Sequence, residues 1–416
     1  MTSDSAYALR EFAIEVVRRL REAGFDAYWA GGCVRDFLLG IQPADFDIAT
    51  NAQPPDIRKL FGFGNTLPVG AAFGVIIVQA SDRRHQVEVA TFRTDSSYSD
   101  GRRPDWVTFS TPEVDAQRRD FTINGMFYDP LAAQVIDFVG GQQDLERHIV
   151  RAIGNADARI SEDKLRMLRA VRIAARFGFE IEDETYRAIG RHAQQAIAVS
   201  GERLAVELRK TLETDASAWA VQAWAETGLL QVLLPEVDAS WQEKNCAQQI
   251  VKMLGLTQEC TWLSRLSALL WAAVGRHCQE TTGQLKVRLR LSNDQAAAIN
   301  FALAHQTTLA EAEHVPWSQL QPLLVSPWAS IAVELLEMRC HIGQANLQTI
   351  QWLRQRLAWP VEQLDPPPLL TGQDLIQSGF RPDPRFKDWL FQVSCLQLDG
   401  KLSTKDQAIR LVSTEY

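Results

Sequence analysis

The spacing of hydrophobic and polar residues changes at about residue 150. Before that point, short apolar runs rich in β-branched and aromatic residues predict strands at residues 26–32, 46–50, 74–80, 86–93 and 134–139. Helical spacing occurs at the N-terminus and again at residues 34–40. Strands and helices intermingled in this way predict an α/β or α+β domain with a small mixed sheet.

From about residue 151 the strand patterns vanish, and apolar residues recur at helical spacing to the end of the chain. A proline-rich break at residues 361–372 is the clearest late linker. We therefore expect an α+β protein with a mixed head followed by an all-helical remainder. The expected divisions are a mixed head at 1–150, a helical neck at 151–215, a helical body at 216–360 and a helical tail at 361–416.

Composition narrows the class of protein. The chain has 416 residues, of which 46% are hydrophobic and 23% charged, as in ordinary globular proteins of more than one domain. Its six cysteines lack metal-ligand spacing, which indicates reduced thiols. No run approaches the roughly 20 apolar residues of a membrane span, so we expect a cytoplasmic protein. The net charge of −8 argues against a general nucleic-acid coat protein but permits a local basic groove.

Asp45 and Asp47 are the first candidate site residues. In a strand, residues two apart project from one face, about 6 to 7 Å apart. Two carboxylates so placed suit hard cations such as Mg²⁺. The same spacing also occurs in solvated surface turns, so the pair by itself leaves both interpretations open.

Gly31, Gly32 and Arg35 precede this pair. Adjacent glycines let the backbone approach a phosphate closely, and an arginine adds a fixed charge with suitable geometry. A dinucleotide-binding turn needs G-x-G-x-x-G, which is absent here. A phosphate cradle followed by paired carboxylates indicates a nucleoside triphosphate with metal, and in-line phosphoryl or nucleotidyl transfer by two metal ions.

Four motifs in order complete the pattern, and together they resemble one family. They are GGCVRD, DFDIAT, RRDFTING from Arg118 to Gly125, and SEDKLRMLRAVRIAARFGF at 161–179. They resemble the class II tRNA nucleotidyltransferases (CCA-adding enzymes) and bacterial poly(A) polymerases, of the DNA polymerase β-like superfamily. The resemblance covers about residues 28–212, with a weaker similarity at 366–390. One departure is Gly125, where many relatives carry alanine.

The resemblance implies roles for the residues of the head. It implies a polymerase β-like head, metal ligation and catalysis by Asp45 and Asp47, and Mg²⁺, or alternatively Mn²⁺, as the cofactor. Glu88 is either a third carboxylate of this site or a surface residue of its strand. The remaining residues of the head are expected to bind the nucleotide, Asp120 through the ribose 2′-hydroxyl: Gly31, Gly32, Arg35, Arg119 and Asp120.

The helix after Ser161 carries a charged stripe. We expect Ser161 to be its N-cap, and positions three apart lie on neighbouring parts of one face. The stripe consists of Asp163, Arg166, Arg169 and Arg172, and Arg151, Arg159 and Arg176 add positive charge. A solvated helix face is the alternative interpretation.

In the family that the chain resembles, this helix serves as a protein template for the incoming base. The resemblance implies that Asp163 and Arg166 recognise the base edge, that Glu162 orients Arg166, and that Arg169 and Arg172 face the triphosphate. An aspartate acceptor and an arginine donor suit cytosine or adenine, whereas guanine and uracil present the wrong donors.

Two further segments resemble parts of the family. Residues 201–212 resemble the motif that steadies the template helix, and the alternative is a plain helical core with Glu207 and Lys210 outside. The polar loop at 94–106, with Arg102 and Arg103, resembles a flexible loop that accompanies the switch to adenine.

The sequence thus predicts an enzyme that adds C, C and A to the tRNA 3′ end from CTP and ATP without a nucleic-acid template. A poly(A) polymerase and a tRNA nucleotidyltransferase that adds only CC or only A are the alternatives. A catalytically inactive RNA-binding protein is disfavoured because both aspartates are present. The expected partners are tRNA, CTP and ATP, and no membrane or protein partner is inferred.

Overall fold

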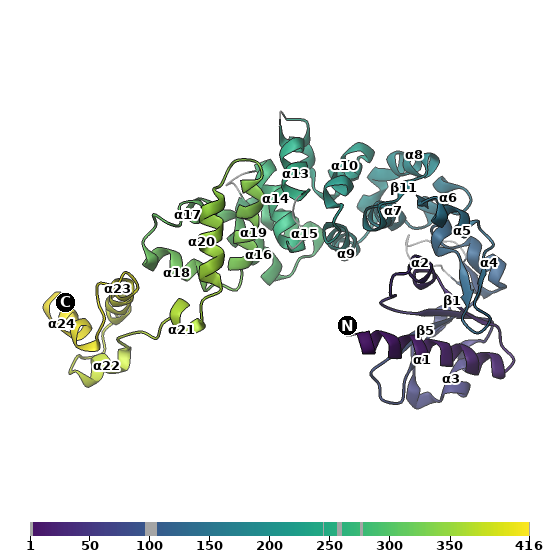
Figure 1. The fold of residues 1–416 in the computed structure, drawn as a ribbon, viewed down its shortest axis with the longest axis horizontal. Helices are drawn as coiled ribbons and strands as arrows, with labels where there is room; N and C mark the ends of the chain where they lie inside the picture. The colour runs from purple at the N-terminus through teal and green to yellow at the C-terminus, as the bar shows by residue number, and fades with distance from the viewer. Residues whose placement is uncertain (1–2, 96–105, 244, 256–259, 275–277, 416) are drawn as a thin grey trace. The chain divides into compact units, whose positions relative to one another are not determined.

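The chain divides into two compact units. The computed structural model describes residues 3–95, 106–243, 245–255, 260–274 and 278–415. One unit comprises Met1–Ala216 with Ala223–Leu233, and the other comprises Ser217–Gln222 with Leu234–Tyr416 (Figure 1). The finer boundaries at 150, 215 and 360 stay predictions. No helix among the described residues has the length and apolar character needed to cross a membrane.

A seven-stranded mixed sheet forms the head of the first unit. β1 pairs antiparallel with β2, whereas β2 pairs parallel with β5. Each of the five segments predicted to be a strand contains one, so the predicted fold class is confirmed. In spatial order the strands are β3 (Thr66–Gly70), β4 (Val75–Gln79), β5 (Gln86–Thr91), β2 (Asp47–Thr50), β1 (Ala27–Ala30), β8 (Phe127–Asp129) and β9 (Gln134–Ile136).

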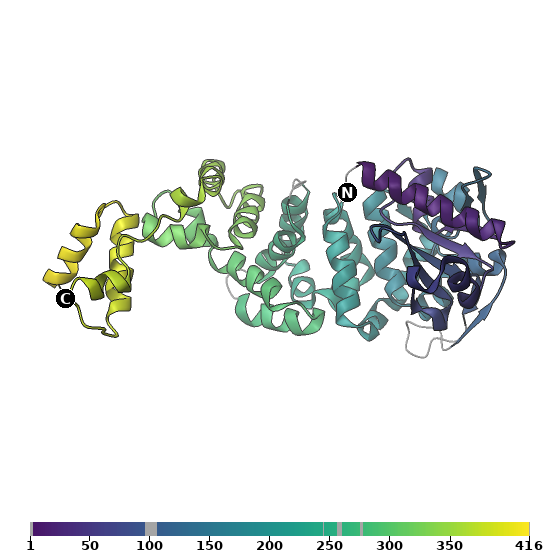
Figure 2. The same ribbon diagram turned by 90° about the horizontal axis from the view of Figure 1, so that it is seen from below.

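Strand alternation gives the sheet two different faces. Helices α1 (Ser3–Glu22) and α3 (Pro54–Phe61) lie on one side of the strands and α2 (Gly32–Leu38) on the other (Figures 1 and 2). Trp29 and Ile48 are fully buried in the core. The residues next to them, Ala30 and Ala49, belong to a second cluster that includes Ala116 of α4 (Pro112–Gln117). The second face is therefore lined by small residues at the centre of the sheet.

Helices follow the head, as predicted from about residue 151. After residue 151 the structure has one strand that was not predicted, β11 (Glu180–Ile181). It pairs in parallel with β10 (Ile149–Val150). Two residues are too few to produce a recognisable period. The helices of this part are α5 (Gly141–Glu146), α6 (Ala156–Glu162), α7 (Leu165–Phe177), α8 (Asp183–His192), α9 (Gly201–Leu212), α10 (Ser217–Thr227) and α11 (Leu229–Leu233).

The described part of the second unit is helical. Its last three helices enclose a small core of their own, which includes Leu375, Trp389 and Val412 (yellow in Figure 2). The helices are α12 (Pro235–Trp241), α13 (Cys246–Leu254), α14 (Trp262–Val274), α15 (Cys278–Leu289), α16 (Asn293–Ala304), α17 (Gln306–Ala310), α18 (Trp317–Leu324), α19 (Ala329–Cys340), α20 (Leu347–Leu357), α21 (Val361–Leu364), α22 (Gly372–Gln377), α23 (Phe386–Leu398) and α24 (Lys405–Glu415).

Gly125 has a packing role that the sequence did not reveal. A Cβ at this position would lie 2.7 Å from Cγ2 of Val139 and 3.0 Å from Cδ1 of Ile153. Its φ of −88° suits any residue, so the constraint is space and not backbone conformation. We expect Gly125→Ala to lower the free energy of unfolding by about 1 to 3 kcal/mol through overpacking.

Urea denaturation measures this effect, and Gly190→Ala is its matched control. Gly190 lies within α8, where no neighbouring group comes within 4 Å of the position that an added Cβ would take. Alanine there should therefore stabilise the helix by about 0.5 to 1 kcal/mol. Equal stability of the Gly125→Ala protein and the wild type would contradict the packing role.

Candidate active site

Asp47 is the first residue of β2. In the parallel pair of β2 and β5 it lies opposite Glu88, so both side chains project from one face of the sheet. Asp45 differs from the prediction, because it lies in a bend before the strand and not within it. Asp45 is still near enough for its charge to act on Asp47. The charges of three carboxylates therefore meet at the start of β2.

A cleft of about 180 Å³ opens beside Asp47 and Glu88. Small side chains leave this space free on the second face of the sheet, and two arginines add positive charge. The other residues that line the cleft are Ala30, Ile48, Ala49, Ala90, Arg118 and Arg119. The cleft thus combines carboxylates with guanidinium groups, as a site for a metal and a phosphate requires.

The electrostatics of Asp47 fit a cation. Surrounding protein atoms reduce the hydration of its carboxylate, and the charges of Asp45 and Glu88 repel it, so that its pKa is raised to about 7 despite the opposing charge of Arg119. A divalent cation would relieve this repulsion.

The donor set limits how such a cation is held. Among the residues that the structure describes, no group of three or more His, Cys, Asp and Glu side chains is arranged to hold a metal ion. Mg²⁺ is usually bound by one or two carboxylates together with substrate phosphates and water. The Asp45–Asp47 pair fits a metal of this kind.

Gly31 joins the end of β1 to α2 in a conformation that favours glycine. Its φ is +77°, and a Cβ there would lie 3.1 Å from Nη1 of Arg119 and 4.0 Å from Oδ2 of Asp47. The N–H of Gly31 donates to the carbonyl of Met126 at 3.3 Å. Of the two glycines predicted to cradle a phosphate, Gly31 therefore supplies space and Gly32 begins the helix.

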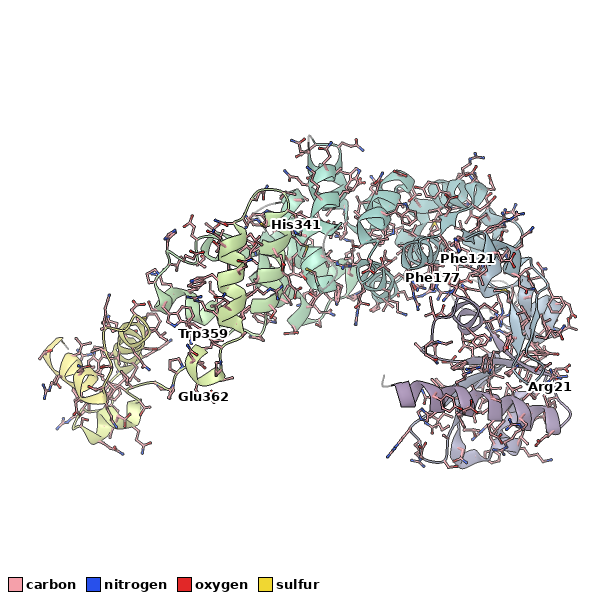
Figure 3. All side chains as sticks on the ribbon, viewed as in Figure 1. Arg21, Phe121, Phe177, His341, Trp359 and Glu362 are labelled. Carbon is pink, nitrogen blue, oxygen red and sulfur yellow. The ribbon has the colours of Figure 1, made fainter. Side chains whose placement is uncertain are left out.

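Arg35 is more buried than a residue predicted to bind the triphosphate would suggest, with 6% of its surface exposed. It donates to Asp36 at 2.5 Å and to Asn124 at 2.6 Å. Its guanidinium also lies 4.5 Å from the ring centre of Phe177. Phe177 is the last residue of α7 (Figure 3). Arg35 thus ties α2 to the RRD segment and to α7, and contact with a triphosphate stays a prediction.

The guanidinium of Arg119 is held in place by Asp115. Two of its N–H groups donate to Oδ2 of Asp115, at 2.9 and 3.2 Å, and Asp115 is 1% exposed. A buried bidentate pair of this kind sets the direction of the guanidinium. Arg119 consequently projects into the cleft beside Gly31 and Asp47.

Asp120 is held as a carboxylate by its neighbours. It accepts hydrogen bonds from Asn124 Nδ2 at 3.0 Å and from the N–H of Phe121 at 2.8 Å. Although burial raises its pKa, the charge of Arg169 and these hydrogen bonds lower the pKa overall. Asp120 is therefore an ionised acceptor, as recognition of a hydroxyl would require.

The charged helix begins later than predicted. Ser161 is not an N-cap, because it lies in the last turn of α6, and α7 begins at Leu165. Asp163 lies between the two helices in an extended conformation. Its Oδ1 accepts from the N–H of Leu165 at 3.1 Å. Asp163 therefore accepts the first N–H of α7 although Lys164 is the N-cap, and the predicted stripe runs along α7 only from Arg166.

Asp163 and Arg166 are both anchored, and both are about 8% exposed. Nη2 of Arg203 donates to both carboxylate oxygens of Asp163, at 2.9 and 3.1 Å. Arg166 donates to Glu162 at 2.6 Å, so the predicted pair with Glu162 is present. Further N–H groups of Arg166 donate to the carbonyls of Arg159 and Arg118.

These contacts leave hydrogen-bonding capacity at the start of α7. An arginine has five N–H donors, and within the described residues three of those of Arg166 have partners. Two donors remain on Arg166, and the carboxylate of Asp163, three residues earlier in the chain, has lone pairs to spare. A fixed donor and a fixed acceptor can together recognise the edge of a base.

Glu207 pairs with the next two arginines of the stripe. It lies 2.6 Å from Nε of Arg172 and 3.6 Å from Nε of Arg169, and Arg169 also lies 3.7 Å from Asp120. Glu207 is 4% exposed, so the alternative that placed it outside a plain helical core is wrong. Segment 201–212 instead fixes the charged residues of α7.

Three of these supporting residues were not singled out from the sequence: Asp36, Asp115 and Arg203. Arg203 and Glu207 are four residues apart and so share one face of α9, a clue within a segment already singled out. Asp36 and Asp115 gave no such clue. The predicted loop residues Arg102 and Arg103 lie outside the described residues.

Fold and site together define a nucleotidyltransferase: a mixed-sheet head with carboxylates at the start of a central strand, followed by helices. The model of the poly(A) polymerase head domain matches residues 27–151, and that of the probable RNA- and SrmB-binding site of polymerase A matches residues 178–240.

The relatives identify the family. A CCA-adding enzyme from Latilactobacillus sakei is 32% identical over 89% of each chain, and one from Limosilactobacillus fermentum is 32% identical over 96% of this chain and 95% of its own. The crystal structure of the Bacillus stearothermophilus CCA-adding enzyme with CTP superposes with a TM-score of 0.77, at 28% identity and 96% coverage of both chains. The chain belongs to the CCA-adding enzyme family, and it is an enzyme.

Proposed function

We propose that the protein adds C, C and A to the 3′ end of tRNA, using CTP and ATP and no nucleic-acid template. The observation that carries this proposal is the anchored pair of Asp163 and Arg166 at the start of α7. Relatives that align over most of the chain are CCA-adding enzymes, and one related structure holds CTP.

In the proposed reaction, the 3′-hydroxyl oxygen of the RNA attacks the α-phosphate in line. The bond from the α-phosphorus to the bridging oxygen breaks, pyrophosphate leaves, and the hydroxyl proton passes to solvent. Asp45 and Asp47 would hold Mg²⁺, which stabilises charge on the phosphate oxygens when bound. Arg119 would bind the nucleotide and Asp120 the ribose 2′-hydroxyl, which would select ribonucleotides.

Base choice would come from α7. Arg166 has two N–H donors to offer, and Asp163 has acceptor capacity, so cytosine and adenine suit the pair and uracil and guanine do not. Arg203 and Glu162 would hold the two residues in place. Arg169 and Arg172, fixed by Glu207, would face the triphosphate.

We assign recognition of tRNA to the body at 216–360 and the tail at 361–416, after the nucleotidyltransferase head at 1–150 and the neck at 151–215. These helices would hold the folded RNA while its end reaches the head. The cytoplasm, where tRNA is processed and used, is the proposed location.

An incorporation assay tests the product. The purified protein is incubated with tRNA that lacks its CCA end, and with CTP and ATP singly and mixed. We expect two cytidines with CTP alone and CCA with the mixture. Long adenylate tails on unrelated RNA with ATP alone would instead identify a poly(A) polymerase. A product that stops at CC would identify an enzyme that adds only the two cytidines. An A added only to tRNA that already ends in CC would identify an enzyme that adds only the adenosine.

A further inference from the structure

A second pocket lies on the neck helices, next to the residues assigned above. Its volume is about 420 Å³. Arginines of α7, a lysine of α9 and three residues at and beyond the end of α9 line it. These residues are Arg172, Arg176, Lys210, Glu213, Thr214 and Asp215.

The pocket adjoins the proposed nucleotide site through shared ion pairs. Glu207 contacts both Arg172, which lines the pocket, and Arg169. Arg169 in turn contacts Asp120. Arg172 and Arg176 are one helical turn apart, about 6 Å along the axis. An RNA strand whose end reaches a nucleotide bound at Asp120 therefore has a short path to this pocket.

Two of the pocket residues have side chains without a polar partner within the described part of the chain. Lys210 and Asp215 are exposed. Neither side chain has a hydrogen bond or ion pair within the described part of the chain. Arg172 and Arg176 already share their charge with Glu207 and Asp36. The lysine is therefore the main uncompensated cation, and the aspartate is an available acceptor.

This mixture of charges favours a strand of RNA over a nucleoside triphosphate. Of the lining residues only Arg172 is assigned to the triphosphate, and the several negative charges of a triphosphate placed in the pocket itself would be repelled by Asp215 and Glu213. A phosphodiester carries one charge, which suits Lys210 with support from Arg176. A ribose 2′-hydroxyl is a donor that a carboxylate can accept, and this group distinguishes RNA from DNA.

We propose that this pocket binds the sugar–phosphate backbone of the RNA strand that receives the nucleotide. Lys210 and Arg176 bind a phosphodiester, and Asp215 accepts a hydrogen bond from a 2′-hydroxyl. This inference rests on the proposed function, since it takes RNA as the acceptor, and it adds residues to which no role was assigned.

The first test measures affinity and not turnover. Dissociation constants of Lys210→Ala for tRNA lacking its CCA end are determined over a series of NaCl concentrations. We expect about 3- to 10-fold weaker binding at low salt, and a slope of log affinity against log salt that is smaller by about 0.7 to 0.9, because one phosphate contact is lost. The dissociation constant for CTP should stay within about twofold of wild type.

Lys59→Ala is the charge-matched control. Lys59 is an exposed residue of α3 in the same unit and does not line the pocket, so its removal should leave the salt slope unchanged. Equal effects of the two substitutions would overturn the proposal. It would also be overturned if Lys210→Ala weakened CTP binding alone, or changed neither affinity.

The second test concerns the 2′-hydroxyl. Wild type should bind tRNA better than the same tRNA with 2′-deoxy residues in the last two positions, and Asp215→Ala should lose this preference. A preference that persists in Asp215→Ala would remove Asp215 from the pocket's role. Because both tests measure binding, an enzyme that passes them but adds other nucleotides would refute the proposed function and leave this inference intact.

Discussion

Asp47→Ala and Asp45→Ala are each expected to abolish addition of both CTP and ATP, lowering the rate by about 10³-fold or more. Loss of a metal ligand removes several kcal/mol of stabilisation from the charged transition state, and each 1.4 kcal/mol is about a tenfold change in rate. Asp47 already lies among like charges, so its removal should not unfold the protein. Single-turnover incorporation on tRNA lacking its end, with Mg²⁺ present, measures the effect.

Asp183→Ala is the matched control for this experiment. The side chain of Asp183 is 90% exposed on α8, and its loss changes the net charge by the same amount. It should retain wild-type rates. Substantial turnover by either Asp45→Ala or Asp47→Ala would remove that residue from the catalytic site.

Arg166→Ala is expected to reduce discrimination between CTP and UTP by about 10- to 100-fold. A good bidentate contact to a base edge is worth about 1 to 3 kcal/mol of discrimination, and Arg166 has two N–H donors to contribute. The ratio of kcat/KM for the two nucleotides measures this quantity. Affinity for tRNA should change much less than that ratio.

Arg187→Ala controls for the loss of an arginine from the neck. Arg187 is an exposed residue of α8, with only long ion pairs of 3.9 and 4.0 Å. It should keep the wild-type ratio. Because Arg166 also binds the backbone carbonyls of Arg159 and Arg118, Glu162→Gln offers a milder variant that frees Arg166 on one side. An unchanged CTP/UTP ratio in both variants would contradict recognition of the base by Arg166.

Local sequence was sufficient for five of the seven strands of the head sheet, but not for β3 and β8, and for the charged segment from Arg166 onward. Short apolar runs rich in β-branched and aromatic residues predicted each of these five strand segments, because such residues favour strands. The motif around Asp45 and Asp47 and the stripe from Arg166 onward were visible because the members of each are close in sequence. The pair of Glu162 and Arg166 was predictable because residues four apart meet on a helix.

Contacts between distant segments decided the rest. Asp163 is held by Arg203, 40 residues away, and Arg172 by Glu207, 35 residues away. Arg35 faces Asn124 and Phe177 and not open solvent, and Gly125 is confined by Val139 and Ile153. No periodic pattern within one segment predicts side-chain contacts between distant segments, since burial and ion pairing depend on which surfaces pack together. The sequence by itself therefore determined the family, most strands of the head sheet and the carboxylate motif. Only the tertiary structure decided which charges are anchored and which, such as Lys210, remain available to a ligand.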